Sequence, residues 1–378
     1  MRRRNVPRSL FVLISTGWML SALPIVAICA PPDAKKEAML NLSGVSIDPL
    51  NVSGIAARDG LLVIGSDEGS SIQVFKKTGP NTYQAIASGP IQLDTKSAKS
   101  AEVDIEGIAW DDSHVYVVGS HSLVRKEAKN DKTVAENHER LKADPEDKPS
   151  PSRKQIFRLK LDPNGALVSD SVEHITLDEV FKHHPILERF RHIPSKENGI
   201  DIEAIAVNGD ELLVGFRGPS LRGPYIPVLA LKFKNGQFKT GAIQTEDRFL
   251  DLGGRGIRDM TAVPGGGFLV LGGPVGDEPT PYQLYFWDGQ DALPGKNAPK
   301  AKDRVKPLCR ISCPDVRLND GKVTVLSGNY VSCDESSAKA EGVEFVEMKG
   351  GEIRFIIVYD TAANGALTLF SCPFVKPA

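Results

Sequence analysis

The chain has 378 residues, with 46 lysine and arginine residues against 48 aspartate and glutamate residues, so its formal net charge is −2. This length is enough for one large repeat domain or two ordinary domains, each with a sizeable core. Without the four arginines of residues 2–8 the net charge would be −6, which argues against a nucleic-acid-binding protein, because such a protein would need a basic face.

The N-terminus has the pattern of an export signal. Residues 2–8 carry four arginines, and residues 10–30 are apolar with only small polar breaks. Ala27 and Cys29 are small residues of the kind that a cleavage site requires. We predict a signal peptide over residues 1–29, with an uncleaved membrane anchor as the alternative. Cleavage removes four arginines and no acid, so the net charge falls from −2 to −6.

The remaining chain predicts a linker over residues 30–39 and one domain over residues 40–378. That domain consists of short apolar alternations separated by turns, as in DPNGAL at 162–167, KNGQF at 234–238 and NDGKV at 319–323. Asn-Gly and Asp-Gly between such alternations are the strongest short-range signals of a β-hairpin. Many hairpins in series indicate an all-β antiparallel protein.

A short acidic phrase recurs along this domain, and each copy is followed by a turn and an apolar run. The copies are DIEGIAW at 104–110, DIEAIAV at 201–207, RDMTAV at 258–263, EGVEFVE at 341–347 and the non-acidic SGIAAR at 53–58. Recurrence of this kind is the signature of a repeat architecture.

Each repeat divides into four antiparallel strands, which is the composition of a β-propeller blade. In the third repeat we expect strands over residues 201–207, 211–217, 226–233 and 239–244. We predict an all-β propeller of five blades. Six blades is the alternative, because residues 259–341 form a long stretch and a strand near residues 40–47 would complete the last blade. A pair of β-sandwiches is the structural rival.

Two segments interrupt the rhythm of strands. Residues 126–153 are dense in charge and poor in apolar side chains, which predicts a charged surface insertion with one short helix. Residues 177–191, LDEVFKHHPILERFR, have a helical pattern that Pro185 breaks. We expect both segments to decorate the propeller, with a lid as the alternative.

The mature chain would keep four cysteines, all in its last quarter: Cys309, Cys313, Cys333 and Cys372. An even number of cysteines in an exported protein predicts one or two disulfides. Four cysteines allow three pairings, and the sequence does not choose among them. A zinc site is the alternative, although no histidine lies near them in the sequence.

The acidic phrases predict where a site lies. We place Glu106, Glu203, Asp259 and Glu341 at one register of the repeats, with Ser53 in the fifth place. The first strand of a propeller blade lines the central channel, so these carboxylates would converge on one axis. Like charges at close range are costly, and a divalent cation, arginines or protonation must neutralise them.

Three roles are open to these acids. They would bond to backbone amides of the neighbouring blade and hold the ring closed, or bind Ca²⁺ or another divalent cation through several oxygen ligands. The third role is direct acid–base catalysis.

The loops that follow the second strands lie at the same mouth, because an antiparallel return brings the chain back to where the first strand began. These loops carry Asp67, His121, Arg125, Arg217 and Arg222. We expect Arg217 and Arg125 to hold an anionic group and His121 to act as a base. The alternatives are arginines that pair with the carboxylates and a histidine that only bonds within its loop.

At DIEGIAW, IDIEAIA with GFRGP, LGGRGIRDMTAV with GGP, and EGVEF, the sequence resembles a bacterial family of domains of unknown function (3616). The resemblance spans residues 50–365. More distantly, the sequence is similar to esterase-like phytase and calcium-dependent lactonase propellers. That likeness implies a cation in the central channel and hydrolysis of esters or phosphoesters. Lactonase-type propellers mix asparagines with the acids at the metal, and the aligned strands here have none.

The sequence supports two hypotheses. In the first, a periplasmic or secreted propeller is a divalent-metal-dependent hydrolase of small anionic esters or phosphoesters, with Ca²⁺ held by Glu106, Glu203, Asp259 and Glu341. In the second, it is a non-catalytic binding or scaffold propeller with a structural ring of carboxylates and arginines. We expect a small anionic molecule or a cell-envelope component as partner, no nucleic acid, no membrane span after cleavage, and a monomer.

Overall fold

The computed structural model describes residues 30–94, 102–145, 151–276, 278, 280–296, 298–319, 322–333 and 338–375. Residues 31–378 form one compact unit. The predicted signal peptide, residues 1–29, lies outside the described residues. No helix in the described part of the chain is both long and apolar enough to cross a membrane.

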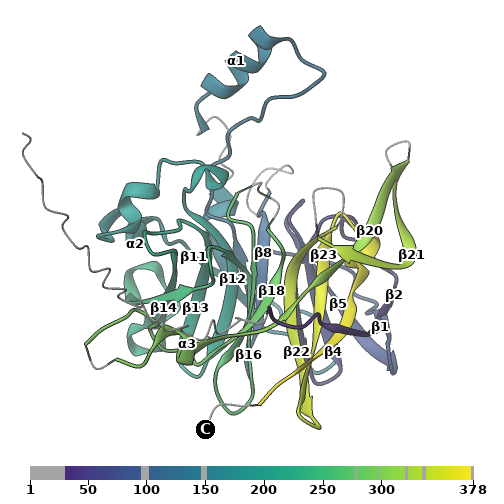
Figure 1. Ribbon diagram of the computed structural model, residues 1–378. Coiled ribbons are helices and arrows are strands. Elements are labelled where there is room, and N and C mark those ends of the chain that lie inside the picture. The colour runs from purple at the N-terminus through teal and green to yellow at the C-terminus, as the bar shows by residue number, and fades with distance from the viewer. Residues whose placement is uncertain are drawn as a thin grey trace, which may run out of the picture. The chain divides into compact units, whose positions relative to one another are not determined.

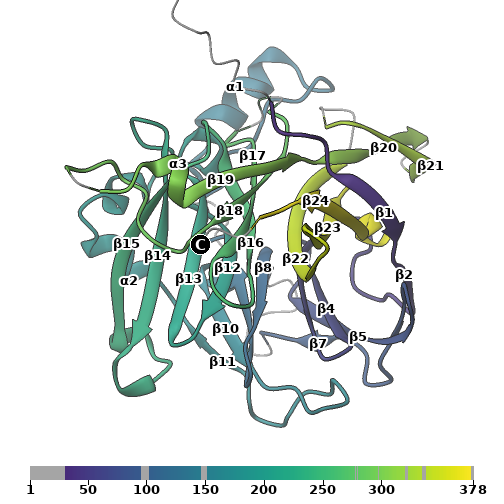
Figure 2. The ribbon, with the colours of Figure 1, turned by 60° about the horizontal axis from the view of Figure 1, so that its bottom comes forward.

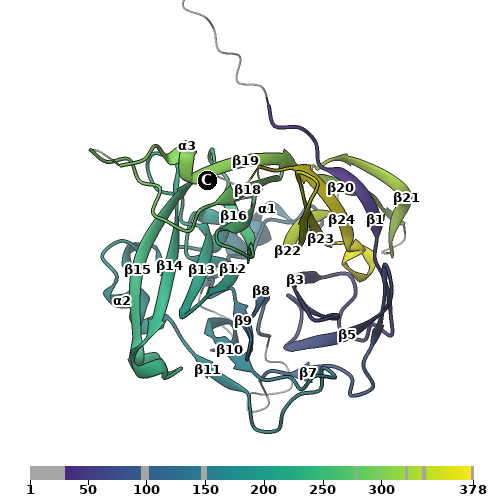
Figure 3. The ribbon, with the colours of Figure 1, turned by 90° about the horizontal axis from the view of Figure 1, so that it is seen from below.

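Five antiparallel sheets surround a common centre, which confirms the five-bladed propeller (Figure 3). The first three blades run from the inner to the outer strand in chain order. Blade 1 contains β3 (Val52–Arg58), β4 (Leu61–Ser66), β5 (Ser71–Gly79) and β6 (Thr82–Ala85), with β2 (Asn41–Ser43) and β7 (Ile91–Gln92) added. Blade 2 contains β8 (Ile105–Trp110), β9 (Val115–Gly119), β10 (Ile156–Leu159) and β11 (Glu173–Ile175). Blade 3 contains β12 (Asp201–Asn208), β13 (Glu211–Gly218), β14 (Tyr225–Phe233) and β15 (Ile243–Asp251).

The last two blades complete the ring. Blade 4 contains β16 (Gly256–Ala262), β17 (Phe268–Gly273), β18 (Gln283–Trp287) and β19 (Val305–Arg310). Blade 5 contains β22 (Lys339–Lys349), β23 (Glu352–Asp360), β24 (Thr368–Pro373) and β1 (Lys35–Met39). Each innermost strand contacts the innermost strand of the next blade, and β22 contacts β3. Between blades 4 and 5 the chain forms the two-stranded sheet of β20 (Ser312–Asn319) and β21 (Lys322–Ser332), which is not a sixth blade.

The N-terminal strand β1 closes the ring from within residues 30–39, where the sequence predicts a linker. It pairs antiparallel with β24, with Lys35 opposite Ser371 and Met39 opposite Thr368 (Figure 2). The predicted closing strand near residues 40–47 is instead β2, which pairs parallel with β6 of blade 1. An outer strand is half-exposed on both faces, so KKEAM shows no apolar alternation that would mark it.

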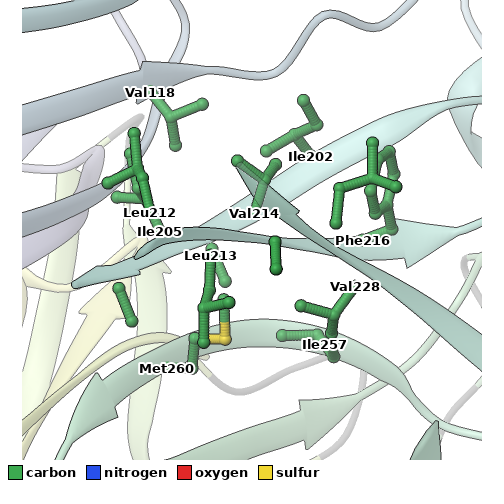
Figure 4. Packing of buried hydrophobic residues seen from close by; sticks show 14 of the residues in the cluster. Val118, Ile202, Ile205, Leu212, Leu213, Val214, Phe216, Val228, Ile257 and Met260 are labelled. Carbon is green, nitrogen blue, oxygen red and sulfur yellow. The ribbon is translucent and has the colours of Figure 1, made fainter. Parts of the chain in front are cut away.

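The core lies between neighbouring blades. Strands such as β4 and β17 are buried along their whole length, and they read as continuous apolar runs because both faces are covered. Figure 4 shows Ile202 and Ile205 of β12 with Val214 of β13 and Ile257 of β16, so side chains of blades 3 and 4 share one cluster. This packing fixes the inner strands, and therefore the side chains that face the centre.

The helices lie outside the blades. In the predicted insertion, α1 (Val134–Lys142) begins at a Thr133–Glu136 capping box and buries none of its residues (Figure 1). The predicted break at Pro185 separates α2 (Asp178–His183) from η3 (Leu187–Phe190). The other short helices are η2 (Pro151–Lys154), η4 (Ser195–Glu197), η5 (Lys234–Gly236), η6 (Thr240–Ala242), α3 (Ala301–Arg304) and η7 (Ala363–Ala366).

The four cysteines form two disulfides, which confirms the prediction and excludes the zinc alternative. Cys309 pairs with Cys372 and joins β19 of blade 4 to β24 of blade 5. Cys313 of β20 pairs with Cys333, the residue after β21. Two disulfides are consistent with an extracellular protein. Export to the periplasm or beyond stays a prediction.

Candidate functional site

Every innermost strand has a β-bulge at the same place, where one residue has no partner on the second strand of its blade. A bulge bends the strand and re-aims its side chain, and bulges are frequent beside functional sites. The five bulged residues are Ser53, Glu106, Glu203, Arg258 and Glu341. The bulges therefore bring three glutamates and one arginine to the same level of the propeller.

In blade 4 the bulged position that corresponds to the glutamates is occupied by Arg258 and not by Asp259. The predicted register of Asp259 is therefore wrong. The correct alignment follows the apolar residue two positions later, which is Met260 in blade 4. Asp259 is 1% exposed and points into the seam between blades. Its carboxylate accepts hydrogen bonds from the backbone N–H of Met260 at 2.8 Å and of Val343 at 2.7 Å. Asp259 thus joins β16 to β22, which is the ring-closing role left open for these acids.

A central pocket of about 1070 Å³ opens above the bulges. Its charged lining includes residues of all five blades, here named the inner cluster. The inner cluster contains the carboxyl groups of Asp67, Asp104, Glu106, Asp201, Glu203 and Glu341 and the cations Arg153, Arg217, Arg258 and Lys339. Asp259 does not line this pocket.

A chain of ion pairs crosses blades 3, 4 and 5. Arg217 Nε lies 2.6 Å from Asp201 Oδ2 and 3.1 Å from Glu203 Oε1. Arg258 Nη2 lies 3.2 Å from Glu203 Oε2 and also contacts Glu341. The five side chains are at most 12% exposed. Buried charges of this kind are tolerated when each has an opposite partner, so acids and arginines alternate along the wall.

The two remaining cations pair at the ends of this chain. Arg153 of η2 contacts both Glu102 and Asp104. Lys339 Nζ lies 3.2 Å from Asp360 Oδ2, and the nearby charge of Glu341 helps to raise the pKa of Lys339. Both cations are therefore engaged by carboxylates of their own region.

Glu106 and Asp67 have no cation within ion-pair distance among the residues that the structure describes. Burial, followed by the charges of Glu203 and Asp104, raises the pKa of Glu106 well above its ordinary value. Burial, followed by the charge of Glu341, raises the pKa of Asp67 to about 9. Both shifts favour the protonated form near neutral pH.

Burial also raises the pKa of Glu203, against the lowering effect of Arg217 and Arg258. Two atoms of its contact with Arg258 are left without a hydrogen bond. Among the described residues that line the pocket, Glu203 Oε2, Arg258 Nε and Asp67 Oδ1 are buried atoms without a hydrogen-bond partner. His121 Nε2 and Ser371 Oγ are two more such atoms outside the pocket lining. Buried polar atoms are normally satisfied, so each of the three in the pocket requires an explanation.

The predicted catalytic residues are not brought together. Arg217 belongs to the inner cluster, and Arg125 lines the same pocket outside that cluster, where its Nη2 lies 3.2 Å from Glu197 Oε2. His121 does not line the pocket. Its Nδ1 lies 2.9 Å from the Gly119 carbonyl oxygen, its ring packs edge-on against Phe181, and burial lowers its pKa to about 4. Arg222 is exposed outside the pocket lining.

Sequence reasoning missed Arg153 and Lys339. Lys339 stands two residues before Glu341, as Asp104 and Asp201 stand before their glutamates, so the repeat alignment contained it. Arg153 ends the charged insertion and follows a segment without a repeat pattern, so no sequence signal marked it.

The predicted calcium ligands do not form a cation cage as they are arranged here. Glu106, Glu203 and Glu341 line the pocket, but Arg258 takes the fourth place in the ring and contacts two of them. In the described ranges, no group of three or more His, Cys, Asp or Glu side chains has the arrangement of a metal site. Calcium binding therefore stays a prediction.

Comparison with known proteins gives a family match. The family described as Protein of unknown function (DUF3616) matches residues 51–368. No curated protein matches the chain.

Solved structures show similarity of fold alone. A hypothetical protein from Leishmania major is 12% identical with a TM-score of 0.42, and the match covers 91% of each chain. Virginiamycin B lyase from Staphylococcus aureus is 9% identical with a TM-score of 0.34, over 89% of this chain and 99% of that one. The mannose phosphorylase MPT-4 from Leishmania mexicana, in complex with phosphate ion, is 12% identical with a TM-score of 0.37, over 90% and 89%.

Proposed function

The chain belongs to the family of proteins of unknown function DUF3616, and we propose that it is a non-catalytic binding propeller whose central pocket takes a small polar ligand. One observation carries the proposal. The buried acids and arginines of the inner cluster pair with one another, whereas the Glu106 and Asp67 carboxyls line the same pocket and have no ion-pair partner among the residues that the structure describes. The paired groups build rigid walls, and the unpaired groups remain free to bind.

The electrostatics of the pocket favour a neutral or cationic ligand. A protonated carboxyl group donates one hydrogen bond and accepts others, and it gains a full charge when a cation approaches. The guanidiniums of Arg217 and Arg258 are already bound by carboxylates, so an anionic ligand would have to displace them. An anionic partner, as the sequence predicts, would therefore bind in the part of the same pocket that Arg125, Lys126 and Lys129 line.

Divalent-metal-dependent hydrolysis is the second candidate, and the same two carboxyls favour it. Ca²⁺ binds carboxylate oxygens in flexible geometry, and its binding expels protons from its ligands. Ca²⁺ would therefore ionise Glu106 and Asp67. The Arg258 guanidinium opposes it, because a fixed positive charge stands in the ring that would surround the ion.

A thermal melt of the protein in EDTA, followed by addition of Ca²⁺, Mg²⁺ or Mn²⁺, separates the two candidates. A ligand that binds only the folded state raises the melting temperature by mass action. The binding proposal expects no metal-specific rise, but a rise with a polar organic ligand that is lost in Glu106→Gln. Glu173→Gln is the matched control, because Glu173 is 51% exposed and pairs with Arg158 outside the pocket. A metal-specific rise lost in Glu106→Gln, together with ester or phosphoester hydrolysis, would contradict the proposal.

A further inference from the structure

The floor of the central pocket contains a buried donor and a buried acceptor that are neighbours and are both unmatched. Arg258 is 4% exposed and Glu203 is 2% exposed. Arg258 Nε and Glu203 Oε2 have no hydrogen-bond partner among the described residues. The same guanidinium lies 3.2 Å from that oxygen through its Nη2 atom. The two unmatched atoms therefore belong to the two partners of one ion pair.

Only some chemical groups satisfy both atoms. An Nε–H requires an acceptor, and a carboxylate oxygen requires a donor. An ammonium group or a metal ion cannot accept from the Nε–H, and an ionised carboxylate has no proton to give to Oε2. A hydrogen phosphate could do both, but it would bring negative charge among the six carboxyl groups of the inner cluster. A hydroxyl group does both and carries no charge. A neutral group adds no charge to the inner cluster, and of its ion pairs only the contact between Arg258 Nη2 and Glu203 Oε2 has to open.

The rest of the pocket repeats this requirement. Within the described ranges, the Glu106 and Asp67 carboxyls line it without an ion-pair partner, and a protonated carboxyl also both donates and accepts. A ligand with several hydroxyl groups would satisfy these positions together. The volume of about 1070 Å³ is ample for a molecule of this kind.

We propose that the central pocket recognises a neutral, hydroxyl-rich small molecule, a polyol or a saccharide, with one hydroxyl bridging Arg258 Nε and Glu203 Oε2 and others on Glu106 and Asp67. The inference rests on the proposed binding function and names its ligand class. Because both bridged atoms are covered in this structure, the contact between Arg258 Nη2 and Glu203 Oε2 opens as the hydroxyl enters.

Arg258→Lys tests the bridge. Lysine keeps a positive charge between Glu203 and Glu341 but has no Nε–H. The matched control is Arg248→Lys, because Arg248 is 5% exposed and binds Glu211 outside the pocket. Isothermal titration calorimetry with D-glucose, N-acetyl-D-glucosamine and myo-inositol should show binding to the wild type and to Arg248→Lys. Affinity in Arg258→Lys should be at least about tenfold weaker, the effect of losing a hydrogen bond to a charged group.

Charged probes distinguish this inference from the function on which it rests. Spermidine, inorganic phosphate and Ca²⁺ are titrated in parallel. If only a charged probe binds, and Glu106→Gln abolishes its binding, the pocket binds ligands but the hydroxyl inference is overturned. If no probe of either kind binds, both proposals fail and the inner cluster is purely structural.

A structure of the wild type covers the case in which Arg258→Lys does not fold. Crystals soaked in the neutral probe that binds best should show a ligand hydroxyl within hydrogen-bond distance of Arg258 Nε and Glu203 Oε2. A water molecule that keeps this position, with the probe elsewhere or absent, would overturn the inference.

Discussion

Replacing Asp259 with alanine separates a structural carboxylate from a metal ligand. In the wild type this carboxylate accepts from the backbone N–H groups of Met260 and Val343, at 2.8 and 2.7 Å. Both donors belong to residues at most 1% exposed, so water cannot replace the lost acceptor. Leaving a buried donor unsatisfied costs about 1–3 kcal/mol. Asp259→Ala should therefore lower the free energy of unfolding by about 2–6 kcal/mol, in EDTA and in Ca²⁺ alike.

Urea denaturation followed by circular dichroism measures this loss. Asp259→Asn keeps one acceptor oxygen, so its loss should lie between those of the wild type and the alanine variant. Asp48→Ala is the control, because exposed Asp48 also accepts from a backbone N–H, that of Leu50 at 2.9 Å. Its loss should stay near the surface value of about 0.5 kcal/mol. Two results would refute the proposal that Asp259 stabilises the fold by joining β16 to β22. In one, Asp259→Ala is no less stable than this control. In the other, it is destabilised only when Ca²⁺ is present.

Three further predictions concern the charges and the disulfides. The folded pKa of Asp67, about 9 against an ordinary 3.8, means that wild-type stability falls as pH rises between these values. The free energy of unfolding of Asp67→Asn should therefore rise relative to that of the wild type by up to about 1.4 kcal/mol per pH unit, which urea titrations at several pH values measure. If the unfolding free energies of the two proteins change in parallel with pH, the pKa of Asp67 is not raised. Glu203→Gln should lower the melting temperature equally with and without Ca²⁺, because Arg217 and Arg258 lose a shared counter-charge worth about 3–5 kcal/mol; a loss restricted to one condition would contradict this. The Cys309–Cys372 disulfide closes a span of 63 residues, and the Cys313–Cys333 disulfide closes a span of 20. Replacing the first pair by serine should therefore lower the free energy of unfolding by about 1 kcal/mol more than replacing the second pair. If denaturation experiments show the reverse order, loop entropy does not explain the stabilisation.

Burial explains which strands the sequence predicts well. In blade 3 the three inner strands, expected over residues 201–207, 211–217 and 226–233, agree with β12, β13 and β14 to within one residue. The fourth was expected over residues 239–244, but β15 begins at Ile243 and ends at Asp251. Inner strands are covered on both faces and show long apolar runs, whereas β15 is exposed over much of its length and has no such mark.

The candidate site was predicted in position but not in detail. Repeated phrases identify the strands that face the centre, because each phrase precedes the turn into a buried strand. A bulge, however, inserts one residue, and the predicted register put Asp259 where the structure has Arg258. His121 was placed at the mouth by its loop alone. Its ring turns to Phe181 and the Gly119 carbonyl, a packing choice that no spacing encodes.

Blade 4 has Arg258 at the bulge where three other blades have a glutamate, and this arginine supplies a positive charge beside the glutamates. In the other blades the residue after the bulge is glycine or alanine, and a Cβ on Gly342 would meet Ser53 O and Ile55 Cγ2 at 3.1 Å. At the β16–β22 seam the same position holds Asp259, which uses the space to bond Val343. Arg258 then stands between Glu203 and Glu341 and replaces repulsion by attraction, worth about 4 kcal/mol for unit charges about 4 Å apart at an effective dielectric constant of about 20. This attraction is the physical reason why we expect the ring to be stable without a bound cation, and why the proposed ligand would bind at Glu106 and Asp67, which Arg258 does not contact.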